Sequence, residues 1–316
     1  MKFLKYSNGD EMPMIGFGTY YLSFDDAYDV IRKAIRIGYR HFDCAPIFDN
    51  QEAIGKAIKD AIKAGEVTRK DLWITSKLWN DRHRYNDVEP ACEKILDKMN
   101  LDYLDLFLIN WPVSFEKKVK FPERSEDYLE EMDAPMEDTW TGMEDCQDAK
   151  LTRHIGLSNF NIARVQQVLN DCMMPPEINQ CEWHPYLPQQ SLYDYCRLNK
   201  ILMTAFAPLG SPGREAKYTH PNEPFLLTEP AITEIAKKHG CTEAQALIAF
   251  ALKRKTAAIV KASNEEHMKE NLGAEEVNID REDLRSLIVL SKYRYFKGDE
   301  FTSNGSPYKL TDLWEY

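Results

Sequence analysis

Residues 38–77, GYRHFDCAPIFDNQEAIGKAIKDAIKAGEVTRKDLWITSK, contain one complete strand–helix–strand unit. The short apolar runs at 40–43 and 73–77 predict buried strands. Between them, residues 51–64 carry apolar side chains at three- and four-residue spacing, which predicts a helix with one buried face. A helix of this length returns the chain to the starting edge of a sheet, so the two strands can pair in parallel. This stretch therefore predicts a βαβ unit.

The same alternation runs along the rest of the chain. We predict eight strands, at residues 15–18, 40–43, 73–77, 104–110, 154–158, 178–181, 202–207 and 257–260. The predicted helices between them include residues 25–37, 51–64, 88–99, 139–149, 163–170, 190–199, 230–238 and 243–253. Eight strands with intervening helices favour a closed α/β barrel of the (β/α)₈ or TIM type over an open sheet. A chain of 316 residues has the length of one such barrel, so we expect residues 1–316 to form a single domain.

Four segments lie outside this alternation. Residues 2–15 form two short extended stretches around Asn8-Gly9, which predicts an N-terminal β-hairpin. Long loops are expected after the fourth strand, at 113–138, and after the seventh strand. The C-terminal tail, 291–316, is rich in aromatic residues and ends at Tyr316. Loops that follow the strands of a barrel form the walls of its site, although surface excursions without function are the alternative.

The composition excludes several classes of protein. A formal net charge of −11 argues against nucleic-acid binding, because phosphates would be repelled. No apolar run is long enough to span a membrane, and residues 1–8 carry no apolar export signal, so we expect a cytoplasmic protein. The seven cysteines are odd in number and contain no CxxC pair, which favours reduced thiols over disulfides or a zinc site.

Polar or aromatic residues follow nearly every predicted strand. They are Asp43, Lys77, Asn110, Trp111, Ser158, Asn159, Gln180, Phe206 and Lys261. One such residue is usually a hydrogen-bonded structural group. Because the carboxyl ends of all strands meet on one face of a barrel, so many together favour a ligand site there.

Several motifs resemble those of the aldo-keto reductases, in order and spacing over nearly the whole chain. The matching stretches are residues 38–45 with Asn50 and 54–55, 74–80, 106–112, 155–161, 180–186, 207–212, 259–261 and 270–271. The resemblance is to NADP-dependent carbonyl reductases of the aldose reductase type. It implies a (β/α)₈ barrel that transfers hydride from a nicotinamide cofactor to an aldehyde or ketone without a metal.

The resemblance also implies four catalytic residues, and this chain matches two of them. In the family a Tyr donates the proton, a Lys paired with an Asp makes that phenol more acidic, and a His orients the carbonyl. Asp43 and Lys77 match the Asp and the Lys, whereas the Tyr and His positions hold Phe48 and Asn110. Losing a general acid commonly costs ~10²- to 10⁴-fold in rate. Natural divergence and deliberate substitution would both produce this pattern.

The cofactor positions implied by the resemblance are better kept. Ser158, Asn159 and Gln180 match contacts to the nicotinamide carboxamide, and Phe206 replaces a stacking Tyr. The remaining positions match contacts to the pyrophosphate, 2′-phosphate and adenine: Leu209, Ser211, Lys261, Asn264, His267, Glu270 and Asn271. His267 stands where many members have Arg, and a neutral His binds phosphate more weakly. NADPH is expected because Lys261 is present, with use of NADH as an alternative.

The expected partner is a small-molecule carbonyl compound, bound by a monomer or a dimer. The substrate pocket would be bounded by Tyr20, Trp79, Trp111, Phe115 and Phe121. These aromatic walls favour a compound with an apolar or planar surface, and sugars also stack on such rings. Two functions remain open: a carbonyl reductase with an altered site, and a non-catalytic NADP(H)-binding redox sensor or scaffold.

Overall fold

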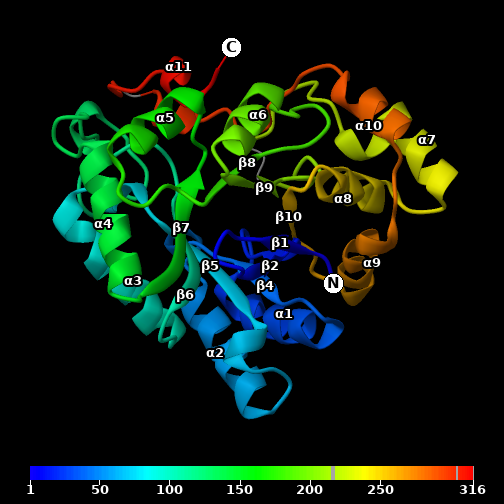
Figure 1. Cartoon of the computed structure of the whole chain (residues 1–316), viewed down its shortest axis with the longest axis horizontal. Coiled ribbons are helices and arrows are strands. Elements are labelled where there is room, and N and C mark those ends of the chain that lie inside the picture. The colour runs from blue at the N-terminus through cyan, green and yellow to red at the C-terminus, as the bar shows by residue number, and fades with distance from the viewer. Residues whose placement is uncertain (215–217, 304, 316) are drawn as a thin grey trace.

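Eight parallel strands close into a barrel in chain order, and the last strand pairs with the first (Figure 1). The computed structural model describes residues 1–214, 218–303 and 305–315. The barrel strands are β3 (Ile15–Gly18), β4 (His41–Asp43), β5 (Trp73–Leu78), β6 (Leu104–Ile109), β7 (Thr152–Ser158), β8 (Ile178–Glu182), β9 (Leu202–Phe206) and β10 (Ala257–Val260). The predicted (β/α)₈ barrel is therefore confirmed, and the strand bounds differ from the predicted ones by at most one or two residues.

Helices surround the barrel and bury their apolar faces against it. They are α1 (Phe24–Ile37), α2 (Gln51–Lys63), α3 (Tyr85–Met99), α4 (Met136–Asp148), α5 (Ile162–Asp171), α6 (Gln190–Leu198), α7 (Pro230–His239), α8 (Glu243–Lys253), α9 (Glu265–Gly273), α10 (Arg281–Ile288) and α11 (Leu310–Leu313). Some of these helices start with a side-chain cap: Ser23 accepts a hydrogen bond from the backbone of Asp26, and Thr242 forms a capping box with Gln245. The last three helices, α9, α10 and α11, were not among the predicted helices.

The predicted N-terminal hairpin covers the end of the barrel at which the strands begin. Strands β1 (Phe3–Lys5) and β2 (Glu11–Pro13) pair in antiparallel register (Figure 1). In the turn between them, Oδ2 of Asp10 lies 2.9 Å from Nε2 of His154. His154 is the first residue of the fully buried part of β7. The Tyr6 ring packs on the same imidazole at 4.0 Å. Because these contacts cover this end, a site in the barrel must open at the other end.

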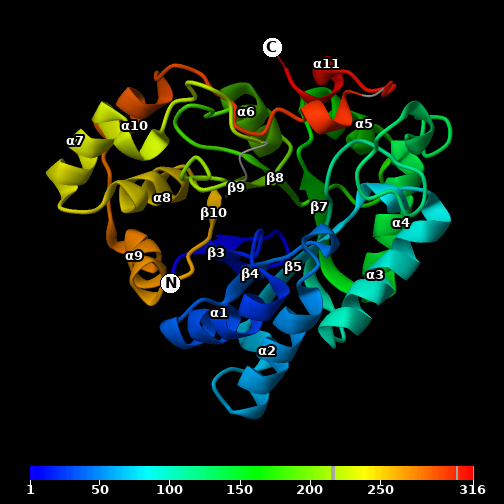
Figure 2. The same cartoon turned by 180° about the vertical axis from the view of Figure 1, so that it is seen from behind.

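At the opposite end, the long loops and the C-terminal segment lie over the strand ends (Figure 2). The loop after β6 is braced by an antiparallel bridge between Phe115 and Tyr128. The tail packs on this loop through a hydrophobic cluster that is separate from the main core. This cluster is made of Trp79, Trp111, Val113, Phe115, Tyr128, Phe301, Tyr308, Leu313 and Trp314. Tyr316, predicted as part of the aromatic tail, lies outside the described residues.

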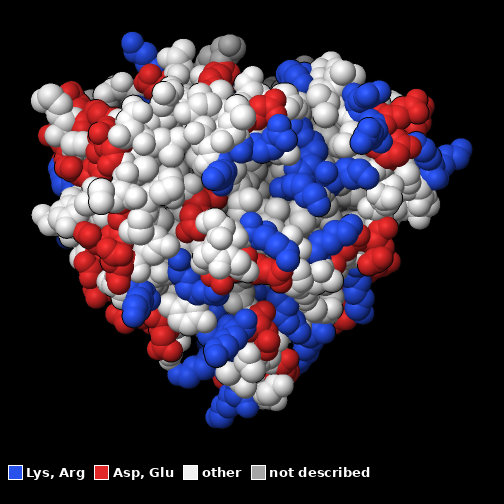
Figure 3. Space-filling view, in the orientation of Figure 1, with Lys and Arg blue, Asp and Glu red and all other residues white. Residues whose placement is uncertain are grey.

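The acidic net charge is unevenly distributed over the surface. In the orientation of Figure 1, Lys and Arg side chains gather over the region of α6 and α8, while acidic side chains are spread around the rim (Figure 3). Within the described residues, no helix has the length and apolarity needed to cross a bilayer.

The packing of α2 on α3 yields a stability prediction. A Cβ atom added at Gly55 would lie 2.2 Å from the backbone oxygen of Met99, so the two helices would have to separate. We expect Gly55→Ala to lower the free energy of unfolding by about 1–3 kcal/mol, the usual cost of overpacking. Gly273→Ala is the control, because its added atom would meet the movable end of the Gln245 side chain. Urea unfolding of both variants checks this, and equal stability of the two would contradict it.

Candidate active site

A cavity of about 280 Å³ opens at the carboxyl ends of the barrel strands. Its walls come from strand ends, from the loops after β3, β6 and β9, and from the C-terminal segment. The lining residues include Tyr20, Tyr21, Asp43, Phe48, Lys77, Trp79, Asn110, Trp111, Phe121, Ser158, Asn159, Gln180, Phe206, Leu209, Ser211, Arg214, Tyr218, Lys261, Phe296 and Phe301. Most of the predicted strand-end residues therefore meet in one cavity.

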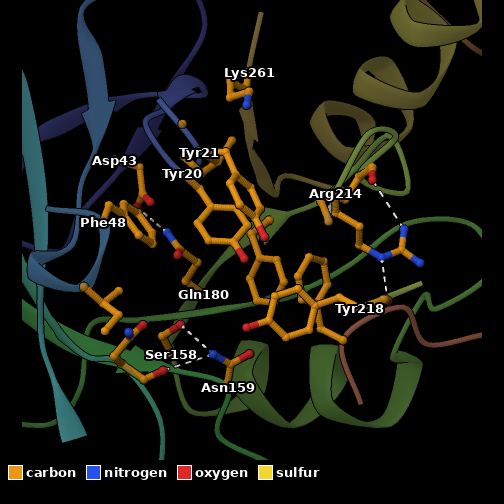
Figure 4. A pocket seen from close by; sticks show the side chains of 18 of the residues that line it. Tyr20, Tyr21, Asp43, Phe48, Ser158, Asn159, Gln180, Arg214, Tyr218 and Lys261 are labelled. Carbon is orange, nitrogen blue, oxygen red and sulfur yellow. Dashed lines mark hydrogen bonds between the residues drawn. The ribbon is translucent and has the colours of Figure 1, made fainter. Parts of the chain in front are cut away.

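A buried ion pair lies at the base of this cavity. The ammonium of Lys77 donates to Oδ1 of Asp43 at 2.6 Å and to the backbone oxygen of Cys44 at 3.2 Å. From across the barrel, Nε2 of Gln180 donates to Oδ2 of Asp43 at 2.7 Å (Figure 4). Both carboxylate oxygens are thus occupied, so the ammonium is held in one position at the cavity floor. Burial raises the pKa of the Cys44 thiol to about 12, which keeps this neighbour protonated and unreactive.

Phe48 and Asn110 line the cavity beside this pair. Phe48 ends a 3₁₀ turn, Pro46–Phe48, and its ring lies 5.0 Å from that of Tyr20. Asn110 directly follows β6, and its backbone oxygen accepts a 3.0 Å hydrogen bond from Nδ2 of Asn159. A phenyl ring carries no transferable proton, and an amide donates hydrogen bonds without titrating at neutral pH. At these two positions the site can orient a polar oxygen but cannot protonate it.

Asn159 presents an unused acceptor. Its Nδ2 also contacts Oγ of Ser158 at 3.3 Å, while among the described residues Oδ1 has no hydrogen-bond partner although it is buried. Its φ of 63° lies in the left-handed region, which Asn tolerates better than most residues. A buried acceptor of this kind calls for a donor from outside the protein, such as a ligand amide. The predicted contact to a carboxamide therefore fits the geometry, although the role itself stays a prediction.

Phe206 supplies a flat apolar face to the cavity. It ends β9 and packs edge-to-face against Phe296, with ring centroids 5.5 Å apart and an interplanar angle of 80°. Leu209 and Ser211 follow it along the cavity wall. In Figure 4, Lys261 lies at one end of the view and Ser158 and Asn159 at the other, with Tyr20 and Tyr21 between them. The cavity is thus elongated, with an ammonium and an amide site at opposite ends.

Lys261 is exposed at the rim of the cavity, directly after β10. Its ammonium lies 5.8 Å from the centroid of the Tyr21 ring. Partial removal from water lowers the pKa of this lysine, and an anion at the rim would raise that pKa again by favouring the charged form. This position suits a phosphate group.

Four residues predicted to bind the cofactor lie outside the cavity lining, on and before α9. Asn264 caps this helix by accepting from the backbone of the exposed His267 at 2.8 Å. Glu270 accepts a hydrogen bond from Thr242, and Asn271 is buried beside Tyr39. Their position beyond Lys261 is compatible with the far end of a long ligand, and their roles stay predictions.

One predicted pocket residue is misplaced. Tyr20, Trp79, Trp111 and Phe121 line the cavity as expected, but Phe115 does not. Phe115 is fully buried behind Trp79 and packs against Tyr128 and Phe301, with centroid distances of 5.7 and 5.8 Å. The chain turns into the bridge at this residue, which directs its side chain into the aromatic cluster. Phe301 from the tail takes the expected place in the lining.

Arg214 and Tyr218 are two of the lining residues that had no sequence signal. Arg214 lies in the loop after β9 and is nearly buried. Its guanidinium donates to the backbone oxygens of Tyr218, Gly210 and Ser211 at 3.0–3.3 Å and pairs with Glu223. Arg214 therefore braces this loop, and Tyr218 is held beside it (Figure 4). No local pattern distinguishes such an arginine from a solvated one.

Comparisons with known proteins agree with this geometry. The sequence model of the aldo/keto reductase family matches residues 14–290. The chain is 42% identical over 316 residues to the aldo/keto reductase slr0942 of Synechocystis sp., covering 100% of this chain and 97% of that protein. It is 36% identical over 307 residues to aldo-keto reductase family 1 member A1 of Gallus gallus, covering 96% and 93%. It is also similar to the solved aldose reductase of Schistosoma japonicum, with a TM-score of 0.86, 35% identity and coverage of 95% and 96%.

The buried ion pair can be tested without any ligand. Asp43→Asn leaves the Lys77 ammonium buried without its counter-charge, so we expect the free energy of unfolding to fall by about 3–5 kcal/mol. Adding Lys77→Met removes the stranded charge and should recover much of this loss. Urea unfolding of both single variants and the double variant measures the coupling. Losses that simply add would show that the two side chains do not interact in solution.

Proposed function

Because this chain belongs to the aldo/keto reductase family, whose members are NAD(P)H-dependent oxidoreductases, we propose that it reduces an aldehyde or ketone with NADPH at this cavity, at a rate limited by Phe48. The observation that carries the proposal is the Asp43–Lys77 pair at the cavity floor. A buried ion pair is costly to maintain and adds little to the binding of a neutral ring. The presence of this ion pair beside Phe48 and Asn110 favours catalysis over cofactor binding alone.

The residues that would hold the cofactor are those that face the cavity from both of its ends. Asn159 Oδ1, Ser158 and Gln180 would bind the carboxamide, Phe206 would stack on the nicotinamide ring, and Lys261 would meet the 2′-phosphate. When bound, NADPH supplies the hydride. His267 is exposed near the expected phosphate end and gives it a weaker contact than Arg would, so NADH is the alternative cofactor.

The protein's own contribution is to stabilise the negative charge that develops on the carbonyl oxygen. Lys77 lies on β5, and Asn110 directly follows the neighbouring strand β6. Lys77 is in register with Leu108, two residues before Asn110. The ammonium of Lys77 offers positive charge, and the amide of Asn110 offers a hydrogen bond. The aromatic walls formed by Trp79, Trp111 and Phe121 favour a substrate with an apolar or planar surface.

Protonation of the product is the step that this site performs poorly. Phe48 occupies the place from which a phenol would act, beside Tyr20 and the ion pair. The same observation favours the second candidate, a non-catalytic NADP(H)-binding sensor or scaffold. Single-turnover oxidation of bound NADPH by a reactive aldehyde separates the two. Binding without any oxidation would leave the sensor or scaffold as the function.

The cofactor assignment rests on Lys261. A lost charged hydrogen bond costs roughly 1.5–3 kcal/mol, so Lys261→Met should weaken NADPH binding about ten- to a hundredfold. NADH, which lacks the 2′-phosphate, should bind almost as before. Titration of each cofactor against the native chain and the variant measures both constants. Equal weakening of the two cofactors would mean that the phosphate binds elsewhere.

The missing acid can be restored. Phe48→Tyr should raise carbonyl reduction by ~10²-fold or more, because it returns a phenol to a shape already fitted to an aromatic ring. This activity should fall as pH rises through the pKa of the new phenol, since only the protonated form can donate. Adding Asn110→His should increase the rate further and change the pH profile, because two coupled groups then titrate. Steady-state NADPH consumption with several aldehydes across pH measures these effects.

Tyr20→Phe is the matched control, because it changes a hydroxyl on the neighbouring ring. It should leave the gain from Phe48→Tyr in place. If the restored variants bind NADPH but stay as slow as the native chain, the site has diverged beyond these two positions. The reductase proposal would then be wrong.

A further inference from the structure

Glu182, the last residue of β8, carries a carboxylate that is fully buried. Its Oε1 accepts hydrogen bonds from the backbone N–H of Tyr295 at 2.7 Å and from Nε2 of His184 at 2.9 Å. Its Oε2 accepts from the backbone N–H of Phe296 at 2.9 Å. Burial alone raises the pKa of a carboxyl group, but here these donors outweigh it and the pKa of Glu182 lies below its ordinary value. The carboxylate is therefore ionised and bound on both oxygens.

These bonds attach the C-terminal segment to the barrel. Tyr295 and Phe296 are more than a hundred residues from Glu182 in sequence, at separations of 113 and 114. The neighbouring Tyr293 adds a backbone bond to Tyr186 at 3.0 Å. Segment 293–296 thus crosses the end of β8, and one carboxylate binds two of its backbone N–H groups there.

Tyr295 also connects this segment to the loop after β9. Its hydroxyl donates to the backbone oxygen of Pro224 at 2.9 Å, and its ring lies 4.8 Å from the guanidinium carbon of Arg214. On its other side, the ring packs on His184 at 5.1 Å. The tail, the strand end and the cavity loop therefore meet at one residue.

Phe296 extends the attachment into the cavity. It lines the cavity and contacts the ring of Phe206 edge-to-face at 5.5 Å. Phe206 is in register with Glu182 on the adjacent strand, so the carboxylate lies next to the strand end that carries this ring. Because Phe206 is half-buried, a fixed neighbour is needed to keep its face turned to the cavity.

We propose that Glu182 is a positioning residue, whose carboxylate fixes Phe296 against Phe206 and so sets the face on which the nicotinamide ring stacks. This inference rests on the proposed function, since it concerns the nicotinamide half of the site. It assigns no contact between Glu182 and the ligand. The effect of Glu182 reaches the cavity through the backbone of Phe296.

Glu182→Gln is the informative change, because it keeps the shape and removes the charge. Three N–H donors converge on the carboxylate, whereas an amide has only one acceptor oxygen and adds donors of its own. At least one backbone N–H of the segment would then lack a partner, and the segment that carries Phe296 would be held less firmly. We expect binding of NADP⁺ and NADPH to weaken about tenfold, the effect of losing one hydrogen bond to a charged group.

A ligand without nicotinamide distinguishes an effect on the nicotinamide half of the site from a general loss of ligand binding. The probe is 2′-phospho-ADP-ribose, which keeps the adenine, phosphates and ribose but has no ring to stack on Phe206. Its affinity for Glu182→Gln should stay within about twofold of the native value, a change too small to represent a lost hydrogen bond. Phe296→Leu, which keeps the bonds of Glu182 and removes the ring, should show the same pattern. This second variant also keeps the test decisive if Glu182→Gln does not fold.

Asp105→Asn is the matched control. Asp105 is another buried carboxylate that accepts a backbone N–H bond, from Ile74 at 2.8 Å, but it lies near the start of the barrel strands. It should lower stability while leaving both ligands bound as in the native chain. Equal weakening of NADP⁺ and the nicotinamide-free probe in Glu182→Gln and Phe296→Leu would overturn the inference, as would no change in either. If the native chain binds neither ligand, the proposed function fails and the inference fails with it.

Discussion

The carboxylate of Asp43 connects three strands at the mouth of the barrel. Lys77 reaches it from the adjacent strand β5, and Gln180 reaches it from β8 on the far side. The bond from Gln180 can form only if the sheet closes, because an open sheet would keep β4 and β8 apart. Closure in turn brings every strand end to one face, so the cavity, the bond from Gln180 to Asp43 and the predicted cofactor positions share a single cause.

A second buried carboxylate organises the covering of that face. Asp43 fixes groups that come from the barrel itself, whereas Glu182 fixes a segment that arrives from the far end of the chain. Both depend on the same rule: a buried charge is tolerable only when each oxygen is matched by donors. Small changes at either carboxylate are therefore felt in more than one element. The floor of the cavity and its aromatic wall are held by different charges, so they can be altered separately.

Phe48 and Asn110 bring to the cavity no group that could give up a proton at neutral pH. The phenyl ring keeps its aromatic contact with Tyr20, and Asn110 keeps a backbone contact with Asn159. The cavity thus combines the architecture of the family with two lining positions that carry no proton donor.

The sequence alone determined the barrel, because apolar runs and helical spacing are local signals that repeat eight times. It also located Asp43, Lys77, Ser158, Asn159, Gln180 and Phe206 in the cavity, since polar or aromatic residues toward the carboxyl end of a buried apolar run lie near the open face of a barrel. Local signals do not say how irregular segments fold over that face. The inward turn of Phe115, the bracing role of Arg214 and the bonds from Glu182 to segment 293–296 therefore emerged only in the tertiary structure. Each depends on contacts between parts of the chain that no periodicity links, and the energy of a buried side chain is decided by those contacts.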